Sequence, residues 1–260
     1  PTISEEAVNQ SETFLIRKKR ALIRQIQQIW KSFKSSAITC FSFVSPIGLS
    51  YLQKLFSDSF GYTRPVPHPD QIGLSGEQLR NRTVNLKEDT FRDVTTGIPI
   101  DQQIEMAENA LKAMSLSDNF ARFVLITGHG SSTVNNPYAT GLDCGACGGH
   151  TGEANAKVAA AVLNNIQVRL ALVKRGINIP SSTVFLACLH DTTSDQVAIY
   201  NEYEVPQKAK EEFESVKRSL ALAGHASRTE RALRMSDTGQ SRVDAYIIVR
   251  SKDWSQTRPE

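Results

Sequence analysis

The stretch that decides the fold class begins with Phe123-Val124-Leu125-Ile126 and continues through Gly128-His129-Gly130-Ser131 to Leu142-Asp143-Cys144-Gly145-Ala146-Cys147-Gly148-Gly149-His150. Its first four residues are apolar, and a short apolar run that stops at glycine predicts a buried strand. The next segment is rich in Gly, Asn, Ser and Pro, and a long alanine-rich helix is predicted to begin near Glu153. A loop between a buried strand and a helix is where α/β proteins usually place their chemistry.

Strands and helices are predicted to alternate on both sides of this stretch. The predicted helices cover residues 12–34, 49–56, 101–117, 153–174 and 206–223, and the predicted strands cover residues 37–44, 123–126, 183–188 and 244–249. Asp101 is expected to cap the third helix and Gly176 to close the fourth. Prolines and glycines break the pattern over residues 60–100, which predicts a loop-rich excursion. This order favours an α/β fold with a mostly parallel sheet flanked by helices.

The length and composition are compatible with one large α/β domain or two small ones. The chain has 260 residues, of which 40% are hydrophobic and 22% charged, so a sizeable core is expected. It starts at Pro1 rather than at a methionine, so we expect a segment of a longer protein. We divide it into an N-terminal basic helix, residues 1–35, and an α/β domain, residues 36–260.

The net charge is only mildly basic, at +3 with an isoelectric point near 8.7. Basic residues concentrate in Arg17-Lys18-Lys19-Arg20 and continue through Arg24, Lys31 and Lys34. One interpretation is a solvated helix face, and another is a contact with anionic lipid or an acidic partner. Nucleic-acid binding is disfavoured because no aromatic platform or known module accompanies the patch. No secretory signal and no apolar run of about 18 residues occurs, so we expect a soluble segment.

The candidate chemistry is a zinc site built on His129 and Cys144. Zinc prefers imidazole and thiolate ligands, and glycines would let the loop after the strand fold back and bring the two together. Asp143 could orient a ligand, and Asn135 and Asn136 could brace the loop around it. His190, Asp191 and Asp195 follow the strand at 183–188 and also lie where an active site could form; His190 could hydrogen-bond to the metal loop or cap a turn.

Other interpretations of the same residues stay open at this point. His129 could cap backbone while the cysteines pack in the structure. Cys144-Gly145-Ala146-Cys147 is a C-x-x-C, which before a helix is typical of dithiol redox sites. A zinc ribbon would need a second C-x-x-C, and a Walker-type phosphate loop would need Gly-x-x-x-x-Gly-Lys-Ser/Thr; neither occurs. The four cysteines are too few for a disulfide framework in a chain this long.

Several motifs together resemble a known family. They are Gly128-His129-Gly130-Ser131, Asn135-Asn136-Pro137-Tyr138, the block from Leu142 to Gly149, Asn155-Ala156, Leu163-Asn164, Val168-Arg169, Gly176-Ile177, Ile179-Pro180, His190 with Thr192-Thr193 and Asp195, and Asp253-Trp254-Ser255 with Arg258-Pro259-Glu260. Over most of residues 36–260 they resemble the DabA family, the peripheral subunits of bacterial inorganic-carbon transporters. The Leu142–Gly149 block is highly specific to that family.

The resemblance implies a core similar to that of β-carbonic anhydrases, in which two cysteines and a histidine hold zinc beside an Asp–Arg pair. His129 and Cys144 match the histidine and the second cysteine. The family's first ligand lies in a Cys-x-Asp-x-Arg element, which does not occur in these residues, so the core is expected to be incomplete here. Zinc in such a site activates water to convert CO2 to bicarbonate.

The resemblance also implies a membrane-embedded, DabB-like transporter subunit as partner, and a peripheral location on the cytoplasmic face of the bacterial inner membrane. Two alternatives remain for this segment. It could be a metal-free interaction or scaffold domain of the same assembly, or a dithiol oxidoreductase that uses Cys144 and Cys147.

Overall fold

The structure is a computed structural model. It describes residues 4–6, 10–36, 38–39, 48–60, 72–75, 78, 82–91, 94–133, 136 and 138–234. The chain forms two compact units, one of Glu6–Arg82 and the other of Thr83–Glu260 together with Pro1–Glu5. The boundary predicted from the sequence lies at residue 35, whereas the compact units divide at residue 82.

The unit formed by Glu6–Arg82 is mostly helical where it is described, although Glu6 belongs to a strand and residues 72–75 and Arg82 lie outside helices. Helix α1 (Gln10–Ser35) confirms the helix predicted at 12–34, and η1 (Gly48–Tyr51) with α3 (Leu52–Ser59) confirms the one at 49–56. Most of the strand predicted at 37–44 lies outside the described residues. Ile38 and Thr39 are described and are not in a strand, because the Thr39 hydroxyl donates to the Phe33 carbonyl and folds the chain back onto the end of α1.

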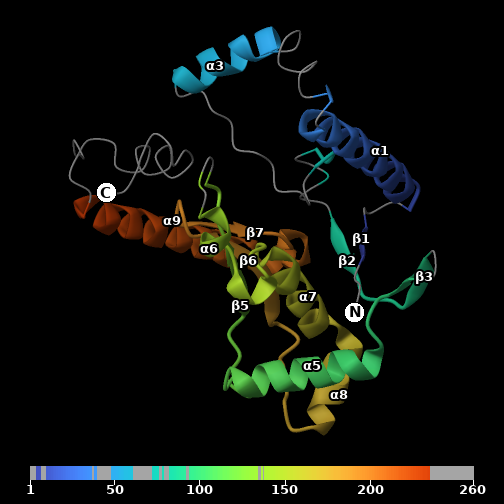
Figure 1. The fold of residues 1–260 in the computed structure, drawn as a ribbon. Coiled ribbons are helices and arrows are strands. Elements are labelled where there is room, and N and C mark those ends of the chain that lie inside the picture. Colours follow the sequence, from blue (N-terminus) through green and yellow to red (C-terminus); the bar gives the residue numbers. More distant parts are fainter. Residues whose placement is uncertain are drawn as a thin grey trace. The chain divides into compact units, whose positions relative to one another are not determined.

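The second unit carries the short strands and the α/β region (Figure 1). Strand β1 (Ser4–Glu6) pairs with β2 (Thr83–Asn85), and β3 (Asp89–Phe91) pairs antiparallel with β4 (Val94–Thr96). The elements that follow are α5 (Ile100–Ala113), β5 (Phe123–Gly130), α6 (Ala139–Leu142), η3 (Gly145–Cys147), α7 (Glu153–Asn164), α8 (Ile166–Lys174), β6 (Val184–Asp191), β7 (Gln196–Ile199), η4 (Glu202–Glu204), η5 (Gln207–Ala209) and α9 (Lys210–Leu233).

The main sheet has the order β5-β6-β7 among the described residues. Strands β5 and β6 are parallel, with Phe123 beside Val184 and His129 beside His190, whereas β7 is antiparallel to β6. The sheet described is therefore mixed. The strand predicted at 244–249 lies outside the described residues. The larger, mostly parallel sheet and the β-carbonic-anhydrase-like core thus stay predictions.

Two apolar clusters lie on opposite faces of this sheet, because successive residues of a strand face opposite sides. On one face Val124, Ile126 and Phe185 pack against helices α5, α7 and α8. On the other, Leu125 and Leu186 pack with Phe213 of α9 and its neighbours. The sheet is therefore covered by helices on both faces, as the alternating order predicts.

The single helix predicted at 153–174 is wrong, because α7 and α8 are separate helices bent by 65°. The break is at Asn165, whose backbone is extended and whose side chain accepts a hydrogen bond from Gln167 N to cap α8. Gly176 follows α8 with a φ of +85°, a conformation that suits its predicted role at the helix end.

The helix predicted at 101–117 is shorter than expected and begins earlier. Helix α5 ends at Ala113, and Pro99 rather than Asp101 occupies its N-cap position; Asp101 lies in the first turn. Proline suits this position because its missing N–H would have had no partner within the helix. Helix α9 runs ten residues beyond the predicted end at 223 and takes in the charged stretch that follows.

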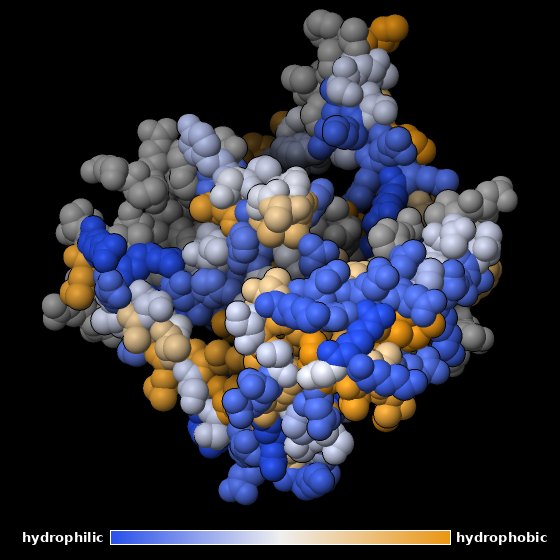
Figure 2. Space-filling view, turned by 90° about the horizontal axis from the view of Figure 1, so that it is seen from below, coloured by the Kyte–Doolittle hydropathy of each residue, from blue (hydrophilic) through white to orange (hydrophobic). Residues whose placement is uncertain are grey.

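Apolar side chains are also found on the outside of this unit. Figure 2 looks from below onto the side of the molecule where α5 and α8 lie in Figure 1, and apolar groups appear there among polar ones. On α8 the exposed apolar residues are Ile166, Leu170 and Val173. No single helix in the described part of the chain has both the length and the apolar composition of a membrane span.

Candidate functional site

The two predicted histidines lie side by side at the carboxyl ends of β5 and β6. Strand β6 continues to Asp191 rather than ending at Cys188, so His190 belongs to the strand and is the register partner of His129. Both residues lie on the side of the sheet that faces α9, because each is four residues after a leucine of that face, Leu125 or Leu186. His129 is exposed, and His190 is partly buried. The sequence pattern places them in separate loops, and only the register brings them together.

Asp195 connects His190 to α9. Its carboxylate is 8% exposed, and its Oδ1 lies 3.5 Å from His190 Nε2. Arg231 Nη2 lies 2.8 Å from both carboxylate oxygens, and Arg231 Nη1 donates to the Thr193 carbonyl at 3.0 Å. Arg228 Nη1 donates to the Ser194 carbonyl at 2.9 Å. Two arginines on one face of α9 therefore hold the loop that carries Asp195.

Asp191 organises the loops that follow both parallel strands. It accepts hydrogen bonds from Ser132 Oγ at 2.6 Å, Thr193 N at 3.0 Å, Thr193 Oγ1 at 2.6 Å and Ser194 Oγ at 2.7 Å. Burial acts to raise the pKa of Asp191, but the hydrogen bonds from Ser132, Ser194 and Thr193 outweigh it and hold the pKa below its usual value. A charged carboxylate thus joins the segment after β5 to the segment after β6.

The long loop after β5 folds back on the strand end, as the glycines predict. Gly152 N donates to the His129 carbonyl at 2.8 Å. A Cβ on Gly152 would lie 2.8 Å from Gly128 Cα, so the backbones approach more closely than any other residue would allow. Asp143 Oδ1 accepts from Ser131 N at 2.7 Å and lies 3.2 Å from Ser131 Oγ. Asp143 thereby holds the segment before Cys144 against the end of β5.

One of the two asparagines predicted to brace the loop can be placed. Asn136 Oδ1 accepts a hydrogen bond from Tyr138 N at 2.8 Å, and its Nδ2 donates to Thr133 Oγ1 at 3.3 Å. These contacts reach only two and three residues along the chain, and the role of Asn136 beside the metal ligands stays a prediction. Asn135 lies outside the described residues.

The cysteines of the C-x-x-C form a turn with interacting sulfurs. Cys147 N donates to the Cys144 carbonyl at 3.0 Å, and Cys144 N donates to the His150 carbonyl at 3.0 Å. A hydrogen bond from the Cys147 thiol lowers the pKa of Cys144, and the same contact raises the pKa of Cys147. Asn155 Nδ2 donates to Cys147 Sγ at 3.3 Å. Both thiols are free, and Cys144 is the one that ionises more readily.

The donors found here match zinc in kind but not in number. An exposed imidazole at His129 and a thiol at Cys144 with a lowered pKa are suitable ligands. Within the described ranges, however, no group of three or more His, Cys, Asp and Glu residues is arranged to hold a metal ion. These residues do not by themselves fit a complete zinc centre, and His129 and Cys144 stay predicted ligands.

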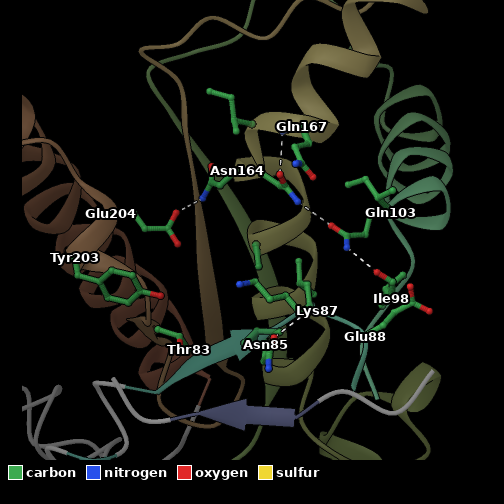
Figure 3. Close-up of a pocket in the computed structure, with 16 residues that line it drawn as sticks. Thr83, Asn85, Lys87, Glu88, Ile98, Gln103, Asn164, Gln167, Tyr203 and Glu204 are labelled. Carbon is green, nitrogen blue, oxygen red and sulfur yellow. Dashed lines mark hydrogen bonds between the residues drawn. The ribbon is translucent and has the colours of Figure 1, made fainter. Parts of the chain in front are cut away.

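A separate pocket lies at the bend between α7 and α8 (Figure 3). Its volume is about 860 Å³, and β2, the start of α5 and η4 form its other walls. Asn165 Nδ2 donates to Gln103 Oε1 at 3.0 Å across one side, and Asn164 donates to Glu204 on another. Burial raises the pKa of Glu204, against hydrogen bonds from Asn201 and Asn164 and the charge of Arg169. None of the predicted ligands lines this pocket.

Two residues of the site, Arg228 and Arg231, are not among those predicted from the sequence, and the central role of Asp191 is not predicted either. Asp191 stands in a run of polar residues, Asp191-Thr192-Thr193-Ser194-Asp195, which is a typical loop composition and does not reveal which carboxylate is central. Arg228 and Arg231 are three residues apart, a spacing that places them on one helix face. The sequence did not predict these two residues because the helix was expected to end at residue 223, before both of them.

Comparison with known proteins identifies the family. The family model described as "Probable inorganic carbon transporter subunit DabA" matches residues 1–260. The chain belongs to the DabA family. Relatives bearing that name include one from Chloroflexus aurantiacus (strain J-10-fl), 48% identical over 258 residues, and one from Roseiflexus sp. (strain RS-1), 49% identical over 242 residues. A Bradyrhizobium sp. (strain BTAi1) relative named DabA 1 is 50% identical over 241 residues.

The alignments cover nearly all of this DabA chain but only part of each relative. They take in 98%, 93% and 93% of the chain, and 31%, 29% and 29% of the relatives from Chloroflexus, Roseiflexus and Bradyrhizobium. The chain therefore spans about 30% of the length of these curated relatives. No solved structure matches it.

Proposed function

We propose that this DabA chain is part of a subunit of an inorganic-carbon uptake system that handles CO2 or bicarbonate. The observation that carries the proposal is the family match over all of residues 1–260, together with relatives at 48–50% identity that are named probable inorganic carbon transporter subunits. Identity at this level over almost the whole chain supports a shared role for the corresponding segment.

The proposal includes a zinc site of the β-carbonic-anhydrase type that hydrates CO2. His129 and Cys144 would be two of its ligands, and the rest of the full-length protein would supply the remainder. The lowered pKa of Cys144 and the loop closure through Asp143 and Gly152 support these two residues as ligands. A partner subunit embedded in the membrane, DabB-like, and a position on the cytoplasmic face of the inner membrane belong to the same proposal.

The experiment is an uptake assay on the full-length protein expressed with its membrane partner. Cells carrying the wild type should accumulate radiolabelled inorganic carbon, and Cys144→Ser or His129→Ala should abolish that accumulation. Cys147→Ser is the matched control, because it changes a thiol in the same turn and is expected to retain uptake. Zinc content of the purified proteins, measured by elemental analysis, should fall with Cys144→Ser and not with Cys147→Ser. Full uptake and zinc content in Cys144→Ser would refute the assignment.

A dithiol redox function is the second candidate, favoured by the hydrogen bond between the Cys144 and Cys147 sulfurs. It predicts that the two residues form a disulfide reversibly, whereas Cys188, which is fully buried with a pKa raised by burial to about 11, stays a thiol. Alkylation followed by mass spectrometry, before and after reductant, distinguishes the two. A mass that does not respond to reductant rules this candidate out.

A further inference from the structure

Helix α1 presents an apolar stripe to the outside of its unit. Leu15, Leu22, Ile26 and Ile29 are spaced by seven, four and three residues, which places them along one face of the helix. Their exposed fractions are 64%, 57%, 56% and 69%. Single exposed apolar residues are common on proteins, but a continuous stripe over four turns indicates a surface that is covered in the working protein.

The same helix is strongly basic. Between Gln10 and Ser35 the sequence has seven Lys and Arg residues and one acidic residue, Glu12. Arg24 and Lys31 are seven residues apart and lie on the face opposite the apolar stripe, whereas Lys18 and Lys19 flank it. The long side chains of such flanking lysines can lie along an apolar surface while their ammonium groups reach outward.

We propose that α1 lies flat on an anionic phospholipid surface, with the apolar stripe inserted among the acyl chains and the basic residues on the headgroups. A long helix of low overall hydrophobicity, with an apolar face and a Lys- and Arg-rich polar face, has the features of a helix that binds in the plane of a membrane interface. Each Lys or Arg near an anionic bilayer strengthens binding about fivefold, so the charge of this helix favours lipid.

The charge of α1 favours a bilayer, rather than another part of the same protein, as the surface that covers the apolar stripe. An apolar stripe that packed inside a larger protein would need apolar neighbours only, and a surplus of basic residues around it would carry a desolvation cost. An anionic headgroup layer satisfies the apolar and the basic groups at once. The inference concerns lipid binding alone and does not depend on the transport function proposed above.

The test measures sedimentation of the purified full-length protein with vesicles of phosphatidylcholine, with and without phosphatidylglycerol. We expect binding to the phosphatidylglycerol vesicles, weakened by high salt because surface charges are then screened. Leu22→Ser/Ile26→Ser should reduce the partition coefficient about tenfold or more, since each side chain loses its transfer into the apolar layer. Gln25→Ser/Gln28→Ser is the matched control on exposed positions of the same helix, and it should bind as the wild type does.

The outcomes separate the occupants of the stripe. Loss of vesicle binding in the stripe variant, with an unchanged melting temperature, supports the inference. A stripe variant that melts at a lower temperature but binds vesicles as well as the control overturns it and assigns the stripe to packing within the protein. Absence of binding by the wild type to either vesicle also overturns it and leaves a protein partner as the occupant.

Discussion

At the scale of single residues, Asp191 shows how one carboxylate can hold together the loops that follow two strands. Its hydrogen bonds come from residues after β5 and after β6, so its charge holds two loops together at the edge where parallel strands end. Hydrogen bonds to a charged acceptor contribute more than neutral ones. The same edge carries His129 and His190, which are register partners in β5 and β6.

Asp191→Asn should therefore destabilise the protein. We expect a loss of about 2 kcal/mol in the free energy of unfolding, because an amide cannot accept from all the donors that surround the carboxylate. The folded pKa of Asp191 is lowered, so its contribution is present above the unfolded pKa of about 4 and is lost as pH falls through the lower folded pKa. Denaturant titrations from neutral to acidic pH should show that the free energy of unfolding falls less with decreasing pH in the variant than in the wild type. Asp118→Asn, at an exposed position, is the control and should change little.

At the scale of elements, the contact between the end of β5 and the start of α7 depends on glycine. Gly128 and Gly152 face each other across this contact, and any Cβ there would meet backbone rather than a movable side chain. Helix α9 contributes in a different way, since its arginines hold the loop of Asp195 from the opposite face of the sheet. The two contacts act at the same edge of the sheet, one at the end of β5 and the other on the loop that carries Asp195.

Gly152→Ala tests the close approach. The added Cβ would lie 2.8 Å from Gly128 Cα and 2.9 Å from His129 N, so strand and helix must move apart. We expect a loss of roughly 2 kcal/mol or more in unfolding free energy. In Gly145→Ala, by contrast, the new Cβ meets nothing within 4 Å, and stability should stay within about 0.5 kcal/mol of wild type. Equal melting temperatures for the two variants would contradict the predicted contact.

Arg231→Ala tests the link from α9. It removes the ion pair with Asp195, whose carboxylate is 8% exposed, and the hydrogen bond to the Thr193 carbonyl. Because Arg231 itself is partly exposed, the expected loss is about 1–3 kcal/mol, less than for a fully buried pair. Arg234→Ala breaks an exposed pair with Glu230 one turn further along the helix and should cost less than about 0.5 kcal/mol. Thermal unfolding of both variants decides between a structural link and a surface contact.

At the scale of the whole molecule, the chain corresponds to about 30% of its relatives' length. Its candidate zinc site is incomplete in the described residues. Two suitable donors lie at or near the carboxyl edge of the sheet, on β5 and on the loop that closes against it. A zinc centre of the expected type takes three protein ligands and an open position. Among the described residues no group of three or more His, Cys, Asp and Glu is arranged to hold a metal ion, so we expect the rest of the full-length protein to supply the remaining ligand.

The isolated chain should therefore bind zinc weakly and not hydrate CO2, whereas the full-length protein should retain about one zinc per molecule. Equilibrium dialysis against zinc, followed by elemental analysis of both proteins, measures the difference. Mutating His129 to Ala in the full-length protein should bring its zinc content down to that of the isolated chain. Tight, stoichiometric binding by residues 1–260 alone would show that the ligand set is complete without the rest.

Local patterns in the sequence determined the kinds of elements and the family. The apolar run at 123–126 predicted β5, helical spacing predicted α1 and α5, and the glycines predicted that the loop carrying Cys144 folds back. These features depend on neighbours along the chain, so a pattern reveals them. The Leu142–Gly149 block indicates the family through its residues alone, and the family match confirms it.

Only the tertiary structure decided which residues that are distant in the sequence come into contact. The break at Asn165 is stabilised by a local cap and by Asn164, which hydrogen-bonds the backbone of Phe185 in β6. The pairing of His129 with His190 follows from strand register, and the role of Asp191 follows from donors 59 residues away as well as adjacent ones. Such contacts join residues far apart in sequence, and their energies depend on burial and geometry that no local pattern records.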